Sequence, residues 1–330
     1  MERTARVAGV TALLIAAFVP LRAQTGQVAG PVVGFVFDRA ASSLRPILGI
    51  PGASVLGNPL TLGYAVSSAA VAPRQDSAFA FAADGSLHFL RLNSGAATEA
   101  NCPVCPSTAE AAVFSPSGTA AALYAAGRVQ IVTGLPGAPT AGATLAVGSM
   151  GETRVGAAHK SSAPPMALSD DGAWLLDSGR DSVEVLSANG GPRRLIATLG
   201  YAPVAFAPGG HDAAVADGKA GVVLFHDVSG QATQQQLAPS TAPVKRPTGV
   251  AFSSDGSHVF ATAGPDGSVM SIEVASGTNT TIQCGCTPSG LVSMGAVLRL
   301  NELGAGPVWL VDNGGTQPRV VFVPALAAAQ

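Results

Sequence analysis

The chain has 330 residues, a formal net charge of −2, 47% hydrophobic residues and only 12% charged residues. The charged fraction is about half of the roughly 25% that is usual in globular domains, which argues against a coiled coil or a basic nucleic-acid-binding protein. The 40 Gly and 24 Pro make about 19% of the chain, below the roughly 25–30% that marks low-complexity disorder. The composition therefore predicts a folded, turn-rich protein that does not bind nucleic acid.

Residues 1–23 predict a secretory signal peptide. A basic start with Arg3 and Arg6 is followed by an apolar run over 7–19 and by Ala23 before Gln24, which is the order of regions in such peptides. A membrane anchor is the alternative, but the run is shorter than the roughly 20 apolar residues of a spanning helix. We therefore expect one mature domain, residues 24–330, that is secreted or periplasmic and has no integral membrane span.

After a predicted hairpin at 32–38 and 44–49, one unit of short strands recurs along the chain. Its clearest copy has apolar segments within 249–256, 258–263 and 268–274, separated by a tight turn and a short Gly/Asp loop. Short apolar runs bounded by Gly, Pro, Asp and Ser are typical of β-strands. Successive turns are marked by Pro73, Pro116, Asp170, Pro208, Ser254 and Gly295. Their mean spacing of about 44 residues is that of four-stranded propeller blades.

Three blocks of this repeat, residues 174–186, 215–225 and 259–274, resemble the YVTN-type and WD40-like β-propellers of secreted bacterial proteins. The resemblance covers about residues 65–325 and implies a fold rather than a function. We predict an all-β propeller with seven blades, the first of them irregular. Six blades with an N-terminal closing hairpin are the alternative. In both cases residues 308–312 and 319–323 are expected to pack near the N-terminal hairpin and close the ring.

The four cysteines form two local pairs, Cys102 with Cys105 and Cys284 with Cys286, each in a connection that precedes a new blade. The pairs belong to different sides of the predicted ring, and a disulfide needs Cα atoms within about 7 Å. We therefore predict two local disulfides, as suits an exported protein. A redox-active dithiol, a four-thiolate zinc site and free thiols remain alternatives.

No motif for catalysis, a cofactor or a metal is found, and we predict none of these. The chain lacks the nucleophile elbow, the phosphate-binding loop and the zinc-protease helix. The five histidines show no spacing typical of metal ligands: His88, His159, His211, His226 and His258.

The best functional indication is a face rich in loops. In a propeller blade, the connections between blades and the loops between second and third strands lie on one face, which here carries both cysteine pairs. That face also receives the insertion at 148–165, with Glu152, Arg154, His159 and Lys160, and loops on a rigid scaffold often carry function. A tolerated insertion is the alternative. We predict a monomeric binding or scaffold protein that recognises a protein or cell-envelope partner through this face. A lactonase-like hydrolase with a site at the central channel is the second hypothesis.

Overall fold

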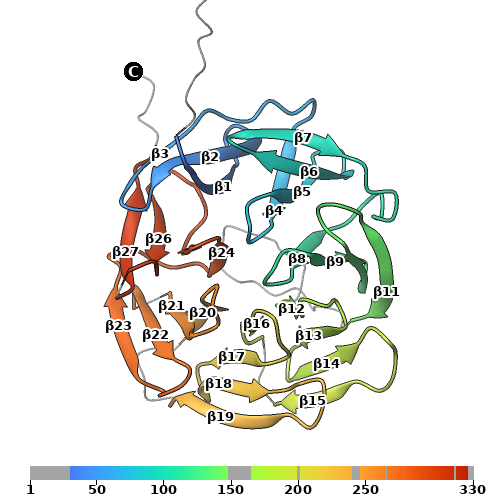
Figure 1. Ribbon diagram of the computed structural model, residues 1–330, viewed down its shortest axis with the longest axis vertical. Coiled ribbons are helices and arrows are strands. Elements are labelled where there is room, and N and C mark those ends of the chain that lie inside the picture. The colour runs from blue at the N-terminus through green and yellow to red at the C-terminus, as the bar shows by residue number, and fades with distance from the viewer. Residues whose placement is uncertain are drawn as a thin grey trace, which may run out of the picture.

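The computed structural model describes residues 30–147, 165–198, 201–239, 246–264, 266–315 and 317–325. These residues form 27 strands in seven antiparallel sheets, which are arranged in a ring as a seven-bladed β-propeller (Figure 1). The predicted fold class and blade number are thus confirmed, and the six-blade alternative is wrong. The predicted signal peptide lies outside the described residues. Within the described ranges no helix is long and apolar enough to cross a bilayer.

Blades 1 to 7 follow one another in the sequence, and within a blade each strand pairs with the next one along the chain. The strands of blades 1 to 3 are β1 (Val32–Asp38), β2 (Ser43–Ile50), β3 (Ala53–Leu56); β4 (Val66–Val71), β5 (Ser77–Ala82), β6 (Leu87–Asn93), β7 (Ala96–Ala100); β8 (Ala111–Phe114), β9 (Ala120–Ala125), β10 (Arg128–Thr133), β11 (Thr140–Ala146). Those of blades 4 and 5 are β12 (Met166–Leu168), β13 (Trp174–Ser178), β14 (Val183–Ser187), β15 (Arg194–Ala197); β16 (Val204–Phe206), β17 (Ala213–Asp217), β18 (Gly221–His226), β19 (Thr233–Ala238). Those of blades 6 and 7 are β20 (Pro247–Phe252), β21 (His258–Ala263), β22 (Ser268–Glu273), β23 (Asn279–Gln283); β24 (Val292–Met294), β25 (Val297–Arg299), β26 (Val308–Asp312), β27 (Arg319–Val323).

The connections divide the ring into two faces. In blades 2 to 7 the first strand lies nearest the axis and the fourth strand is outermost (Figure 1). We call the side with the turns between first and second strands the turn face. The opposite side, which we call the loop face, carries the loops between second and third strands and the connections from one blade to the next. This arrangement follows from antiparallel pairing of consecutive strands.

The core lies between the blades. The described residues form seven buried hydrophobic clusters, and each cluster joins two neighbouring blades. The second strands are buried along both sides because each side packs on another blade, and small residues such as Ala120, Ala121 and Ala122 fit this crowding. Phe79 and Phe260 are the largest fully buried side chains. Burial of strands on both sides explains the high hydrophobic fraction of the sequence.

The ring closes between blades 7 and 1, as the sequence predicts. Val36 of β1 and Ile47 of β2 share a buried cluster with Val308, Leu310 and Val323 of blade 7. Blade 1 is irregular because its sheet contains only β1, β2 and β3 in the described chain.

Candidate functional site

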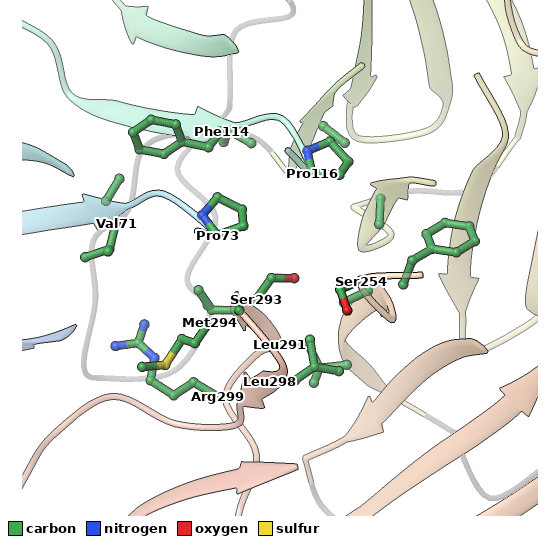
Figure 2. Close-up of a pocket in the computed structure, with 18 of the residues that line it drawn as sticks. Val71, Pro73, Phe114, Pro116, Ser254, Leu291, Ser293, Met294, Leu298 and Arg299 are labelled. Carbon is green, nitrogen blue, oxygen red and sulfur yellow. The ribbon is translucent and has the colours of Figure 1, made fainter. Parts of the chain in front are cut away.

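The innermost strands surround a central cavity of about 580 Å³. Figure 2 shows that Val71 of blade 2, Phe114 and Pro116 of blade 3, and Leu291 and Met294 of blade 7 line it. Alanines and valines of the other innermost strands complete the wall. Most side chains of the lining are therefore apolar, but polar atoms make up nearly half of its exposed wall.

Polar side chains also reach this cavity, among them Gln75, Ser253 and Asn313. Arg299 Nη2 lies 2.6 Å from Glu302 Oε1, and this pair supplies the charged groups of the described lining. Ser254 and Ser293 add hydroxyl groups (Figure 2). Among the described lining residues no His, Cys or Asp is present. Such a lining suits a ligand that combines apolar and polar groups.

On the turn face, one carboxylate ties three blades together. Asp170 Oδ1 accepts the Ser117 N–H of blade 3 at 2.6 Å, and its Oδ2 accepts the Gly209 N–H of blade 5 at 2.7 Å. Next to it, Asp171 Oδ2 lies 2.8 Å from His211 Nε2. Burial acts to raise the pKa of Asp171, but hydrogen bonds from its own turn and from His211 hold the pKa below its usual value. The side chains of Asp170, Asp171 and His211 therefore serve to connect turns of neighbouring blades.

The loop face carries exposed side chains of both charges. Asp84, Arg128, Arg180, Asp181, Lys219 and Asp266 are exposed there. The insertion residues Glu152, Arg154, His159 and Lys160 lie outside the described residues, so their part in a binding surface stays a prediction. An apolar channel opening among charges of both signs is an arrangement suited to binding a partner.

Both cysteine pairs lie in connections on the loop face. The Cα atoms are 5.3 Å apart for Cys102 and Cys105 and 5.1 Å apart for Cys284 and Cys286, within the reach of a disulfide. The first pair borders a cavity of about 400 Å³ that His88 also lines. The structure thus places the predicted partners side by side, and the pairing itself stays a prediction.

A chain of hydrogen bonds beside this cavity was not predicted from the sequence. Ser86 Oγ lies 2.9 Å from His88 Nε2, and His88 Nδ1 lies 2.7 Å from Glu99 Oε1. The ring of Tyr64 stacks on His88 with centroids 3.8 Å apart. Burial, with a smaller effect of the Glu99 charge, raises the pKa of Tyr64 to about 12. The strand register of β6 and β7 brings His88 to Glu99, and no motif in the sequence records that register.

The order serine, histidine, carboxylate is the order of a hydrolytic triad, but the serine has a second partner. Asp84 Oδ1 lies 2.6 Å from Ser86 Oγ and accepts the Ser86 N–H at 2.9 Å. The hydroxyl has one proton, so it donates either to Asp84 or to His88. These side chains therefore share the order of groups with a triad, but they differ from one because Ser86 has Asp84 as a second hydrogen-bond partner.

The other three described histidines also make hydrogen bonds to neighbouring side chains. His226 bridges Asp212 and Gln235, His211 bonds Asp171, and His258 lies 2.9 Å from Ser257 Oγ through Nδ1. Within the described ranges no group of three potential metal ligands is found.

No family model matches the sequence, and no curated protein matches it either. Solved structures match the fold. A candidate 6-phosphogluconolactonase from Bacteroides fragilis has 15% identity and a TM-score of 0.57, covering 88% of this chain and 97% of its own. A functionally unknown protein from Desulfotomaculum acetoxidans has 14% identity and a TM-score of 0.58, covering 88% and 99%. A protein from Lactobacillus plantarum has 17% identity and a TM-score of 0.58, covering 89% and 96%.

At these identities the similarity is one of fold alone. It agrees with the propeller part of the predicted resemblance. Membership of the YVTN-type or WD40-like group stays a prediction.

Proposed function

We propose that the protein is an exported binding protein that recognises a protein or cell-envelope component with its loop face and the channel that opens there. One observation carries this proposal: most side chains that line the central cavity are apolar, and the described lining has no pair of groups suited to nucleophile and base. The mixed charge of the loop face supports it, because such charges orient a partner and select against others.

Export rests on the predicted signal peptide and on the closely placed cysteines, which suit an oxidising compartment. When the full chain is expressed in a secreting host, the purified protein is expected to begin at Gln24. Retention of residues 1–23 on the purified protein would contradict this prediction.

The binding role is tested by affinity capture from an envelope fraction with the mature protein, residues 24–330. One variant lacks residues 149–163, and a second carries Arg180→Glu with Lys219→Glu on the loop face. The matched control is Arg74→Glu on the turn face, where the Arg74 side chain is 46% exposed. We expect both loop-face variants to lose partners that the control keeps. Capture of the same partners by all proteins would refute recognition through the loop face.

Hydrolysis is the second candidate function, favoured by the Ser86–His88–Glu99 chain. In that case Ser86 Oγ attacks an ester carbonyl carbon while its proton passes to His88 Nε2. The alcohol then leaves with that proton, and water releases the acid in a second step.

The probe for this candidate is p-nitrophenyl acetate. If the serine is a nucleophile, Ser86→Ala lowers the hydrolysis rate about 100-fold or more, and Asp84→Ala, which removes the competing acceptor, does not. Equal rates for the unchanged protein and Ser86→Ala would exclude this candidate.

A further inference from the structure

The cavity of about 400 Å³ in blade 2 has two cysteines in its wall. Cys102 and Cys105 both line it, together with residues of β6 and β7. Both cysteines are half-buried, so they are neither sealed in the core nor fully exposed. All the lining residues lie within the continuous described range 30–147. A disulfide between these two cysteines is therefore within reach of a molecule that occupies the cavity.

The segment that carries this pair is held at both ends. It leaves the ladder of β6 and β7 at Ala100, and further on the Ser107 carbonyl accepts the Leu87 N–H at 2.9 Å. Between these points the Cys105 N–H donates to the Cys102 carbonyl at 3.0 Å. These backbone hydrogen bonds keep the two cysteines close whether or not their sulfur atoms are bonded. The pair can therefore be reduced and oxidised again while the blade stays folded.

The second cysteine pair has a different environment. Cys284 is 4% exposed and belongs to a buried cluster with Phe260 and Leu300. Its Sγ accepts the Cys286 N–H at 3.2 Å. Burial hinders attack by a thiol, since thiol–disulfide exchange requires access to a sulfur atom. The chain therefore offers an internal comparison between a pair that faces a cavity and a pair with one buried member.

The rim of the cavity beside Cys102 and Cys105 is acidic. Glu99 lines this cavity with a side chain that is 60% exposed, and its Oε1 lies 2.7 Å from His88 Nδ1. A second carboxylate, Asp84, reaches His88 through the Ser86 hydroxyl. Arg91 of the same strand as His88 donates instead to two backbone carbonyls of blade 3. Two carboxylates thus adjoin one imidazole, and this excess of negative charge favours a cationic ligand.

We propose that the Cys102–Cys105 disulfide is a redox site that oxidises small aminothiols, with Glu99 holding the ammonium group of the substrate. A cavity of about 400 Å³ suits a small molecule. The attacking group in such a reaction is a thiolate, which the acidic rim repels unless the same molecule also carries a positive charge. The inference rests on the predicted local pairing of the cysteines, and it goes beyond the proposed binding function.

The reaction consists of two exchange steps. A substrate thiolate attacks one cysteine sulfur, the S–S bond breaks, and its electron pair stays on the other cysteine, which takes up a proton. A second substrate thiolate then attacks the substrate sulfur of this mixed disulfide and releases the first cysteine, which is protonated in turn. Two electrons and two protons thus pass from two thiols to the protein, and the substrate leaves as its own disulfide.

The experiment uses the full chain and two thiols of equal length, cysteamine and 2-mercaptoethanol, which carry an ammonium and a hydroxyl group respectively. Samples are quenched with acid and alkylated, and peptide mapping by mass spectrometry gives the reduction rate of each cysteine pair. The ratio of the rate of the first pair to that of the second cancels the intrinsic reactivity of each thiol. Glu99→Gln removes the charge and keeps an acceptor for His88. The matched control is Glu273→Gln, at an exposed residue that ends β22 in blade 6.

We expect the first pair to be reduced faster than the second by both thiols. Glu99→Gln is expected to lower the ratio about threefold with cysteamine, because one exposed ion pair is lost, and to leave it unchanged with 2-mercaptoethanol. Glu273→Gln is expected to change neither ratio.

Faster reduction of the second pair, or free thiols at Cys102 and Cys105 in the purified protein, overturns the proposal. An unchanged ratio in Glu99→Gln, or an equal fall with both thiols, also overturns it, since Glu99 would then not recognise the ammonium group. Partner capture by the loop face is independent of these results, so failure of this inference leaves the proposed binding function standing.

Discussion

Replacing Asp170 is expected to weaken the coupling between three blades. Its two carboxylate oxygens accept the N–H groups of Ser117 and Gly209 at 2.6 and 2.7 Å. These residues lie 53 and 39 positions away, in turns of two other blades. Hydrogen bonds to a charged acceptor contribute about 1.5–3 kcal/mol each. Two such bonds would together contribute about 3–6 kcal/mol. Because the Asp170 side chain is only half-buried, we expect Asp170→Ala to lower the free energy of unfolding by less, about 2–4 kcal/mol.

Asp170→Asn keeps the volume of the side chain but removes its charge and one of its two accepting oxygens. The amide keeps one accepting oxygen and turns a donor toward the other N–H group, so we expect a loss of about 1.5–3 kcal/mol. The matched control is Asp181→Asn in the same blade, an exposed residue with no hydrogen bond to its carboxylate within the described ranges.

Urea unfolding followed by the fluorescence of Trp174 and Trp309 measures these differences, and the two reporters lie in blades 4 and 7. The Trp174 signal of the Asp170 variants is expected to change at lower urea than in the control. If Asp170→Asn and Asp181→Asn unfold at the same urea concentration, the carboxylate does not couple the blades and the reasoning fails.

Three other predictions concern pH, backbone geometry and the cysteines. Hydrogen bonds to Gln235 and then Asp212 raise the pKa of His226 above its ordinary value of 6.5, so its stabilisation is complete below that value and is lost as pH rises through the raised pKa. The loss of urea resistance in His226→Phe is therefore expected to be larger at about pH 5.5 than at about pH 9, and an equal loss at both would contradict the assignment. Gly221→Ala is expected to cost about 2–4 kcal/mol, because φ is 83° and a Cβ would clash with the backbone carbonyl at the end of β19. Gly190→Ala has a φ of 85° and open space around the Cβ, so it isolates the strain and is expected to cost about 1 kcal/mol; equal unfolding midpoints for the two variants would refute the clash. In a peptide map made without reduction, each cysteine is expected to be linked to the other member of its local pair, and a link between the two pairs would overturn that assignment.

The repeat explains why the fold could be predicted from the sequence. Each blade depends on features within about 44 residues: short apolar runs, turns containing Gly, Pro or Asp, and a short loop between second and third strands. The markers Pro73, Pro116 and Asp170 lie in the turns between first and second strands. The irregular first blade was also accessible, because an extra hairpin precedes the first marker.

Much less of the candidate site could be predicted from the sequence. Inner-strand residues could be assigned from the turns, but the apolar character of the whole cavity appears only when six strands from distant parts of the chain surround one axis. The Ser86–His88–Glu99 chain depends on the register of β6 and β7, which the sequence pattern leaves open. The predicted binding residues of the insertion remain predictions.

By itself, the sequence determined the repeat, the blade length, the turn chemistry and the closeness of the cysteines within each pair, because each of these depends on residues close together in the chain. Only the tertiary structure decided which residues of different blades are hydrogen-bonded to one another. Asp170 was visible in the sequence as a turn residue, whereas nothing in the sequence analysis pointed to Gln75. Their roles follow from partners brought near by closure of the ring: neighbouring turns for Asp170, and the Phe35 N–H of β1 for Gln75. A closed ring places residues about 40–50 positions apart in contact, and no local pattern encodes which of them will meet.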